Sequence, residues 1–251
     1  TFVWEQVRDA KTGGLARRWA DGEAALPAQL DDHANLAAGF IDLYQASRDP
    51  NWLERAVELT ERMIVGFWDD QDGGFFDSPA GDPLLAFRMK DEFDGAELAG
   101  NSVAAGVLHT LAGLCERADW RQRAGRLFAH YAARLAEHPV AMPQMLVSMD
   151  LATVPARHIV LAGDQDREGL ALLTKEFHGR FLPRDVLLSI DRGETRPQLA
   201  RVAPFVEPLV PQNGKATAYV CVDYACQLPV TDRAAFAAQL DARPARSPEE
   251  A

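Results

Sequence analysis

The sequence repeats a pattern of helical hairpins, and this repeat constrains the fold more than any other feature. Residues 52–56 (WLERA) return as residues 120–124 (WRQRA), 68 positions later, and the Gly-Gly turn at residues 13–15 returns 60 positions later at residues 73–75. Repeats of this length are typical of helical arrays and toroids. A solenoid with units of about 34 residues would give a similar period. The long segment at residues 75–100 argues against it, because stacked short repeats use tight turns.

Apolar residues spaced three and four apart predict the helices of these hairpins. The predicted helices lie at residues 29–47, from Pro50 to a turn at residues 72–74, from Asn101 or Ser102 as the N-cap to Cys115, at residues 120–137, and from Pro143 onward. Consecutive helices joined by so short a link are expected to pack as antiparallel neighbours. The segment up to Gly100 is predicted to be an irregular loop, and a loop of this length is more often functional than not.

A different pattern begins near residue 155. Short apolar runs predict strands at residues 158–164, 185–190 and 217–222, and a helix at residues 167–178 follows the first strand. The proline-bearing segment at residues 197–211 is predicted to be a loop or an edge, and Asp232 is predicted to cap a last helix. This order of elements predicts a small α/β unit.

The chain is therefore predicted to be mainly α. Residues 1–154 are expected to form part of a toroid of helical hairpins, whose long loops gather at one end around a central cavity. Residues 155–241 are expected to form the small α/β unit with its closing helix, and residues 242–251 a disordered tail.

The bulk properties argue against two classes of partner. A formal net charge of −11 disfavours nucleic acid, because nucleic-acid sites are built on a basic face. No apolar run reaches the roughly 18 residues of a membrane span, so no membrane partner is expected. The three cysteines, Cys115, Cys221 and Cys226, fit a reducing compartment better than a disulfide scaffold, which predicts a cytoplasmic protein.

Several motifs are shared with one family. They are residues 30–34, residues 68–76 (WDDQDGGFF), residues 100–102, residues 143–145, and above all residues 214–221 with residues 226–232. The chain resembles the carboxyl-terminal part of the YyaL-type thioredoxin-domain-containing proteins, which include a spermatogenesis-associated relative in animals. The resemblance covers nearly the whole chain, and its closing motif is the most specific part.

This resemblance implies a fold and a set of partners. The fold is part of an (α/α)6 toroid similar to six-hairpin glycosidases and N-acylglucosamine 2-epimerases. The implied partners are an amino-terminal thioredoxin-like domain and the first hairpins of the same polypeptide. The thioredoxin-type active site belongs to that other domain, so none of its residues is assigned in this chain.

Four acidic residues are the candidates for catalysis. Asp31 and Asp32 stand in the first turn of a predicted helix, and Glu92 and Asp94 lie in the long loop. Glycoside hydrolysis uses two carboxylates with unequal pKa values on opposite sides of the scissile bond. The alternatives are that Asp31 and Asp32 only stabilise the helix start, and that Glu92 and Asp94 belong to a solvated charged loop.

Five further residues are candidates for binding a sugar. Asn101 and Ser102 are expected to hydrogen-bond hydroxyl groups, and Phe75 and Phe76 to stack on the sugar ring. His33 stands beside two aspartates and is a candidate general base, although the resembling family is expected to have Tyr at this position. The alternatives are helix capping, a place in the core, and a buried, hydrogen-bonded histidine.

The spacing of histidines, cysteines and glycines predicts no metal site and no cofactor. The histidines form no metal-spaced pair, and no glycine-rich phosphate loop is found. Cys221 and Cys226 are five positions apart, which matches neither a dithiol redox motif nor a zinc knuckle. An unbroken strand would point them to opposite faces, so packing or stabilisation of a turn is expected ahead of redox chemistry.

The predicted function is the binding or processing of a carbohydrate or polyol, of the hydrolase or the epimerase type. The rival from another class is a noncatalytic scaffold attached to the thioredoxin-like domain. A helical-repeat interaction protein is a third possibility, and it requires a period near 34.

Overall fold

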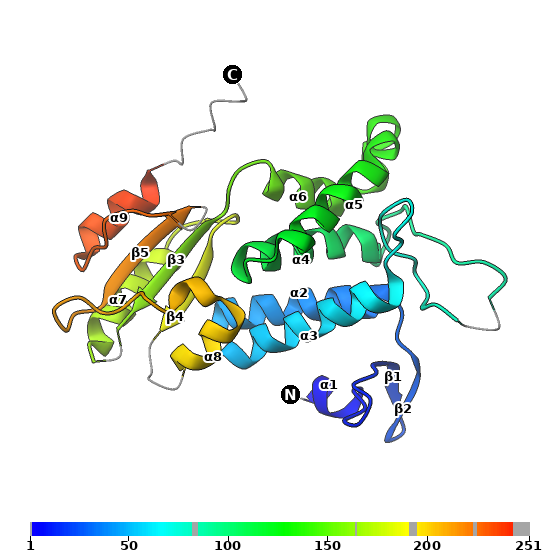
Figure 1. The fold of residues 1–251 in the computed structure, drawn as a ribbon, viewed down its shortest axis with the longest axis horizontal. Helices are drawn as coiled ribbons and strands as arrows, with labels where there is room; N and C mark the ends of the chain where they lie inside the picture. Colours follow the sequence, from blue (N-terminus) through cyan, green and yellow to red (C-terminus); the bar gives the residue numbers. More distant parts are fainter. Residues whose placement is uncertain (1, 82–84, 164, 191–194, 223–224, 243–251) are drawn as a thin grey trace. The chain divides into compact units, whose positions relative to one another are not determined.

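The computed structural model describes residues 2–81, 85–163, 165–190, 195–222 and 225–242. The fold is mainly helical, as predicted, with short strands at both ends of the described chain (Figure 1). The chain divides into two compact units. The hairpin unit comprises Thr1–Ile41, Arg55–Thr110 and Ala118–Met149, and the sheet unit comprises Asp42–Glu54, Leu111–Arg117 and Asp150–Ala251. The disordered tail predicted at residues 242–251 lies almost wholly outside the described residues.

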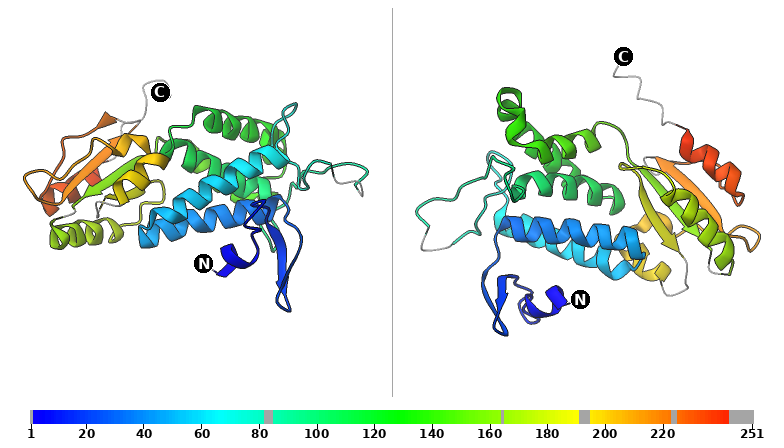
Figure 2. Two further views of the ribbon diagram at one scale, coloured as in Figure 1. Left: turned by 60° about the horizontal axis from the view of Figure 1, so that its bottom comes forward. Right: turned by 180° about the vertical axis from the view of Figure 1, so that it is seen from behind.

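The helices of the hairpins confirm the periodicity of the sequence. They are α1 (Phe2–Gln6), α2 (Leu30–Ser47), α3 (Pro50–Phe67), α4 (Gly100–Leu114), α5 (Ala118–Glu137), the 3-10 turn η1 (Pro139–Ala141) and α6 (Pro143–Ala152). Figure 2 shows α2 and α3 side by side in two further directions, as an antiparallel pair. Each buries the stripe that predicted it, for example Ala34, Ala37 and Ile41 on α2. None of the described helices is both long and apolar enough to cross a bilayer.

The start of α4 differs from the prediction. The helix begins at Gly100, so Asn101 and Ser102 lie inside its first turn and neither is the N-cap. Both side chains belong to fully buried residues. The predicted loop before the helix is confirmed, because no helix or strand occurs in the described residues between Phe67 and Gly100.

A hairpin near the amino end was not predicted. Strand β1 (Ala16–Ala20) pairs antiparallel with β2 (Glu23–Pro27), and the register places Ala20 opposite Glu23. The two residues between them, Asp21 and Gly22, both have positive φ angles, of 54° and 81°. An Asp-Gly pair is a strong signal for such a turn, but the flanking strands are largely exposed and lack the alternation that marks a half-buried strand.

The two Gly-Gly turns have the same pattern of hydrogen bonds. The 60-residue repeat of the sequence is therefore also a repeat of the backbone structure. The turns occupy residues 9–14 and 69–74. In each, the aspartate N–H, of Asp9 or Asp69, donates to the carbonyl of the second glycine at 2.9 Å. The first glycine has a φ of 70° in one turn and 77° in the other. Such angles favour glycine, so the backbone conformation of the turn explains why glycine occupies both positions.

Substitution of Gly73 tests this requirement. A Cβ added at Gly73 lies 3.1 Å from the carbonyl oxygen of Arg126, and the positive φ is itself unfavourable for alanine. We expect Gly73→Ala to lower the free energy of unfolding by about 2 kcal/mol in denaturant titrations. Gly125→Ala is the control, because no atom lies within 4 Å of its added Cβ in α5 and alanine favours a helix by about 0.5–1 kcal/mol. A loss at Gly125 equal to that at Gly73 would contradict the prediction.

The sheet unit contains the predicted α/β pattern. Its strands are β3 (Arg157–Ala162), β4 (Val186–Ile190), β5 (Thr217–Val222) and β6 (Ala225–Cys226), in the order β4-β3-β5-β6. β3 and β4 are parallel and are separated along the chain by α7 (Arg167–His178), whereas β5 is antiparallel to β3. The closing helix α9 (Arg233–Asp241) begins as predicted, with the Asp232 side chain accepting from the N–H of Ala235.

Two predictions for this unit were wrong. The segment after Pro197 is not simply a loop, because Thr195–Val202 forms α8, followed by the 3-10 turn η2 (Pro204–Val206). Pro197 stands in the first turn of α8, where a backbone N–H has no helical partner to lose. Cys221 and Cys226 do not point to opposite faces of one strand, because the chain reverses between them and they form a disulfide.

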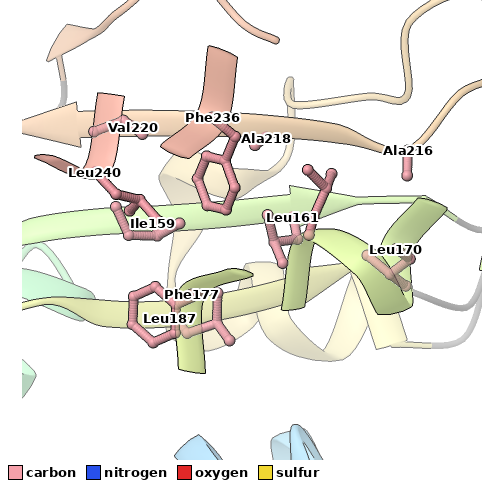
Figure 3. Packing of buried hydrophobic residues seen from close by; sticks show 11 residues of the cluster. Ile159, Leu161, Leu170, Phe177, Leu187, Ala216, Ala218, Val220, Phe236 and Leu240 are labelled. Atoms are coloured by element: carbon pink, nitrogen blue, oxygen red, sulfur yellow. The ribbon is translucent and has the colours of Figure 1, made fainter. Parts of the chain in front are cut away.

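One face of the sheet carries the hydrophobic core of this unit (Figure 3). Alternate residues of the strands, including Ile159, Leu161 and Val220, point to the same side. Phe177 from α7 and Phe236 from α9 pack against them, and both helices therefore cover this face.

A buried ion pair joins three elements of the sheet unit. Nε of Arg157 donates to both carboxylate oxygens of Asp185 at 3.1 Å, and each side chain is only 7% exposed. Nη1 of Arg157 donates to the carbonyls of Gln239, Leu240 and Ala242 at the end of α9. The guanidinium thus binds carbonyls at the end of the helix, where the carbonyls have no intrahelical hydrogen-bond partner.

Removal of this cation should be costly. We expect Arg157→Met to lower the free energy of unfolding by about 3–5 kcal/mol, because Asp185 stays buried without its partner. Arg233→Met is the matched control, because Arg233 is exposed where it pairs with Glu176, and its loss should cost about 1 kcal/mol or less. Denaturant titrations measure both values, and equal losses would refute the assignment.

Candidate functional site

A cavity of about 720 Å³ lies in the hairpin unit beside the irregular segment, and we name it the acidic cavity. Its acids are Asp31, Asp77, Asp91, Glu92 and Glu97, and its bases are Arg17, Lys90 and Arg134. They come from β1, from the start of α2, from α5 and from the segment that joins α3 to α4. Residues of the long loop thus line a cavity.

Asp31 and Asp32 lie in the first turn of α2 and share one partner, Arg17 of β1. Nη1 and Nη2 of Arg17 donate to the two oxygens of Asp31 at 2.9 and 3.0 Å, and Nη1 also donates to Asp32 at 3.0 Å. Asp32 accepts in addition from the N–H of Gln29 at 2.8 Å. Burial raises the pKa of Asp32, and the charge of Asp31 adds to the effect. Arg17 was missed although, like Asp77, it stands three residues after the second glycine of a Gly-Gly turn.

Asp77 lines the cavity and is held by hydrogen bonds to both its backbone and its carboxylate. It was not among the residues predicted from the sequence. Its carbonyl accepts from the N–H of Leu30 at 2.9 Å, which ties it to the start of α2. Its carboxylate accepts from the N–H of Asp91 at 3.1 Å. Burial raises the pKa of Asp77, and the charges of Asp91 and Asp31 raise it further. Its position three residues after the second glycine of the turn was the signal available in the sequence.

Glu92 lies on the cavity wall, as its predicted role requires. Its carboxylate is 3.7 Å from Nε of Arg134 in α5, a long and half-exposed ion pair. The neighbouring Phe93 also lines the cavity, and it is 58% exposed. An exposed phenyl ring beside carboxylates is a better stacking surface than either phenylalanine that the sequence suggested.

Asp94 is placed elsewhere. The residue is buried, and its two carboxylate oxygens accept from the N–H groups of Ala99 at 3.0 Å and Gln144 at 2.8 Å. Gln144 stands in the first turn of α6, so Asp94 caps that helix from a distance while it closes the loop before α4. It does not line the acidic cavity.

Asn101 and Phe75 form a structural pair in the interior. The Asn101 amide donates to the carbonyl of Phe75 and accepts from its N–H, both at 2.8 Å. Phe75 is fully buried, with its ring 4.9 Å from that of Trp68. Neither side chain lines the acidic cavity. These contacts hold the second Gly-Gly turn against α4.

The remaining candidates also lie outside the acidic cavity. His33 is buried, with Nδ1 2.8 Å from the carbonyl of Gln29, and burial lowers its pKa. Ser102 is fully buried in α4. Phe76 lines a neighbouring cavity of about 660 Å³, but the guanidinium of Arg88 covers its ring at 3.9 Å from the centroid.

The acidic cavity therefore combines carboxylates with different surroundings. Asp31 is held by a guanidinium, Asp77 is half-buried, and Glu92 is more exposed. A carboxylic acid with a raised pKa can donate a proton at a pH where exposed carboxylates are ionised. The arrangement can accept hydrogen bonds from hydroxyl groups, and Asp77 is an acid whose pKa burial raises.

The pKa of Asp77 has a consequence for stability. Because burial raises it, the folded state binds the proton more tightly than the unfolded state, so stability falls as pH rises from the unfolded pKa toward the folded pKa, and the cost is complete above both. We expect Asp77→Asn to raise the melting temperature relative to the parent at pH 7. The gain should shrink toward pH 4, near the ordinary aspartate pKa of about 3.9.

Melting curves between about pH 4 and pH 8 measure this difference. Asp70→Asn is the control, because Asp70 is an exposed acid in the turn at residues 69–74. A melting-temperature profile for Asp77→Asn that runs parallel to that of the parent would show that Asp77 has an ordinary pKa.

Comparison with known proteins gives relatives but no assigned activity. No family model matches the chain. The human protein named spermatogenesis-associated protein 20 is 37% identical over 207 residues, which is 81% of this chain and 26% of the human protein. The rat protein of the same name is 32% identical over 240 residues, or 92% of this chain and 30% of the rat protein. A Caenorhabditis elegans protein, named uncharacterized protein B0495.5, is 29% identical over 209 residues, which is 83% of this chain and 28% of that protein.

These matches extend over most of the chain and agree with the animal relative in the family that the motifs resemble. The chain spans between about a quarter and a third of the length of the curated relatives that it matches.

Proposed function

We propose that this chain is the carboxyl-terminal portion of an (α/α)6 toroid and that its acidic cavity binds a neutral carbohydrate or polyol. The observation that supports the proposal is the gathering of five carboxylates and the exposed ring of Phe93 around one cavity. Carboxylate oxygens accept hydrogen bonds from hydroxyl groups, and a phenyl ring packs on the apolar face of a sugar. The excess of acids over bases disfavours a sugar phosphate.

The contacts between successive hairpins support the toroid. Nη2 of Arg62 in α3 donates to the carbonyl of Thr12 in the first Gly-Gly turn, at 3.1 Å. Nη2 of Arg126 in α5 donates to the carbonyl of Asp70 in the second turn, at 2.7 Å. Each turn is thus held by an arginine from the second helix of the following hairpin. A contact that recurs from one hairpin to the next is what a ring of hairpins requires.

Processing of the bound sugar, by hydrolysis or by epimerisation, extends the proposal. Asp77 is the candidate proton donor, because burial raises its pKa. Asp31 and Glu92 are the candidates for the second carboxylate that hydrolysis needs. Asp32 affects the charge of the cavity through its ion pair with Arg17. The other candidates shape the surrounding fold: Asp94, Asn101, Ser102, His33, Phe75 and Phe76.

A noncatalytic scaffold is the second candidate function, and the exposed apolar side chains of the loop favour it. Leu85, Phe87, Met89 and Phe93 are all exposed, Phe87 to 72%. Gathered apolar side chains on a surface are typical of protein contacts. The partner in this alternative is the rest of the polypeptide, for which we propose first hairpins and a thioredoxin-like domain, in the cytoplasm.

Calorimetric titration of the full-length parent protein separates the two candidates. We expect one or more neutral sugars from a panel of monosaccharides, disaccharides and sugar phosphates to bind saturably. Phe93→Ala should weaken that binding about tenfold, because the stacking surface is lost. Phe87→Ala is the matched control, because Phe87 is exposed on the same segment but does not line the acidic cavity, and it should leave the affinity unchanged.

Two results would count against the sugar site. Absence of binding across the panel favours the scaffold. Equal losses in Phe93→Ala and Phe87→Ala place the sugar outside the acidic cavity. Melting curves of both variants must match that of the parent, so that a loss of affinity is not a loss of fold.

A further inference from the structure

We propose that the disulfide between Cys221 and Cys226 is a reversible thiol–disulfide site, that its reaction partner is a dithiol, and that Cys226 is the sulfur attacked. Cys221 ends the buried part of β5 and Cys226 ends β6, and the two are direct partners in the antiparallel register. Their Cα atoms are 3.9 Å apart. This site lies in the sheet unit and does not depend on the proposed sugar site.

The two halves of the disulfide differ in access. Cys221 is fully buried, whereas Cys226 is exposed. β6 is the last strand in the order β4-β3-β5-β6, so among the described residues no strand lies beyond it. Thiol–disulfide exchange needs a thiolate to approach one sulfur from outside. The geometry therefore makes Cys226 the accessible sulfur and Cys221 the leaving group.

The proposal extends to His158 of β3. It is the partner of Cys221 in the register between β3 and β5, and directly paired residues project from the same face of a sheet. The ring of Phe205 lies 5.3 Å from that of His158, so the imidazole is held in a largely dry site. An N–H of an imidazole can donate to a developing thiolate and lower its basicity.

The hairpin does not depend on the disulfide. The N–H of Gln227 donates to the carbonyl of Val220 at 2.9 Å, and Ala218 and Val230 exchange two backbone hydrogen bonds of 2.8 and 3.0 Å. The bond also closes a loop of only five positions, and disulfides across short loops remove the least conformational entropy from the unfolded chain. A purely stabilising role therefore accounts poorly for the pair.

The exchange balances as follows. One thiolate of the partner dithiol attacks Sγ of Cys226, the bond between the two cysteine sulfurs breaks, and Cys221 leaves as a thiolate that takes a proton. The second thiolate of the partner then attacks the partner's own sulfur in the mixed disulfide and releases Cys226. The disulfide of this chain is reduced to two thiols, and the dithiol is oxidised to a disulfide.

Native-state thiol counting tests the reversible site. The folded chain is treated with dithiothreitol, alkylated and weighed, and two additional alkylated thiols per chain are expected. The circular dichroism spectrum should stay the same, the melting temperature should fall by less than about 10 °C, and oxidised glutathione should restore the disulfide. Thiols that appear only under denaturing conditions, or that fail to reoxidise, would overturn the proposal.

A matched pair of variants tests the direction of attack. In a Cys115→Ser background, Cys221→Ser leaves Cys226 alone and Cys226→Ser leaves Cys221 alone. We expect Ellman's reagent to react with Cys226 at least about tenfold faster than with Cys221 in the folded state. Equal or reversed rates would overturn the assignment of Cys226.

The rate at which the disulfide is reduced tests the role of His158 separately. His158→Gln should slow reduction of the disulfide by dithiothreitol several-fold, because Cys221 leaves without its donor. The reaction of Cys226 with Ellman's reagent in the Cys221→Ser background should be unaffected by the same change. An unchanged reduction rate, or an equal slowing of both reactions, would show that His158 has no specific part.

Discussion

The need to hydrogen-bond the buried parts of an irregular segment shapes the loop side of the hairpin unit. Between Phe67 and Gly100 the described chain has no helix or strand to satisfy its N–H and C=O groups, and an unsatisfied buried group is costly. Backbone bonds within turns and side chains from other positions supply the partners instead. The Asn101 amide pairs with both backbone groups of Phe75, and Nζ of Lys90 donates to the carbonyl of Gly73 at 2.6 Å. The bonds of Asn101 hold Phe75 against α4, and the bond of Lys90 joins two parts of the segment to each other.

The same need decides which polar side chains remain for a ligand. Asp94 has both carboxylate oxygens on backbone N–H groups, so it supports the loop from behind. Asp77 does two things at once, because it accepts from the N–H of Asp91 and also lines the acidic cavity. Burial raises its pKa, whereas the hydrogen bond from the N–H of Asp91 acts in the opposite direction. A group fixed by the fold itself is already organised before a ligand arrives.

The sequence predicts what depends on local periodicity and misses what depends on the path of the chain. The apolar stripes of α2 and α3 and the buried strand β3 are local patterns, and they were correctly predicted. The disulfide between Cys221 and Cys226 depends on a reversal of the chain that no periodicity records. Composition likewise shows that Asp94 can do acid–base chemistry. It does not show that two backbone N–H groups lie within reach of its carboxylate and need an acceptor.

The repeat explains how opposite charges come to surround one cavity. Arg17 and Asp77 both stand three residues after the second glycine of a Gly-Gly turn, at equivalent positions of the 60-residue repeat. The two turns have matching hydrogen bonds, and both side chains line the acidic cavity. One has become a cation that binds the acids of α2, and the other a half-buried acid. One position of the repeat therefore contributes a charge of each sign to the cavity.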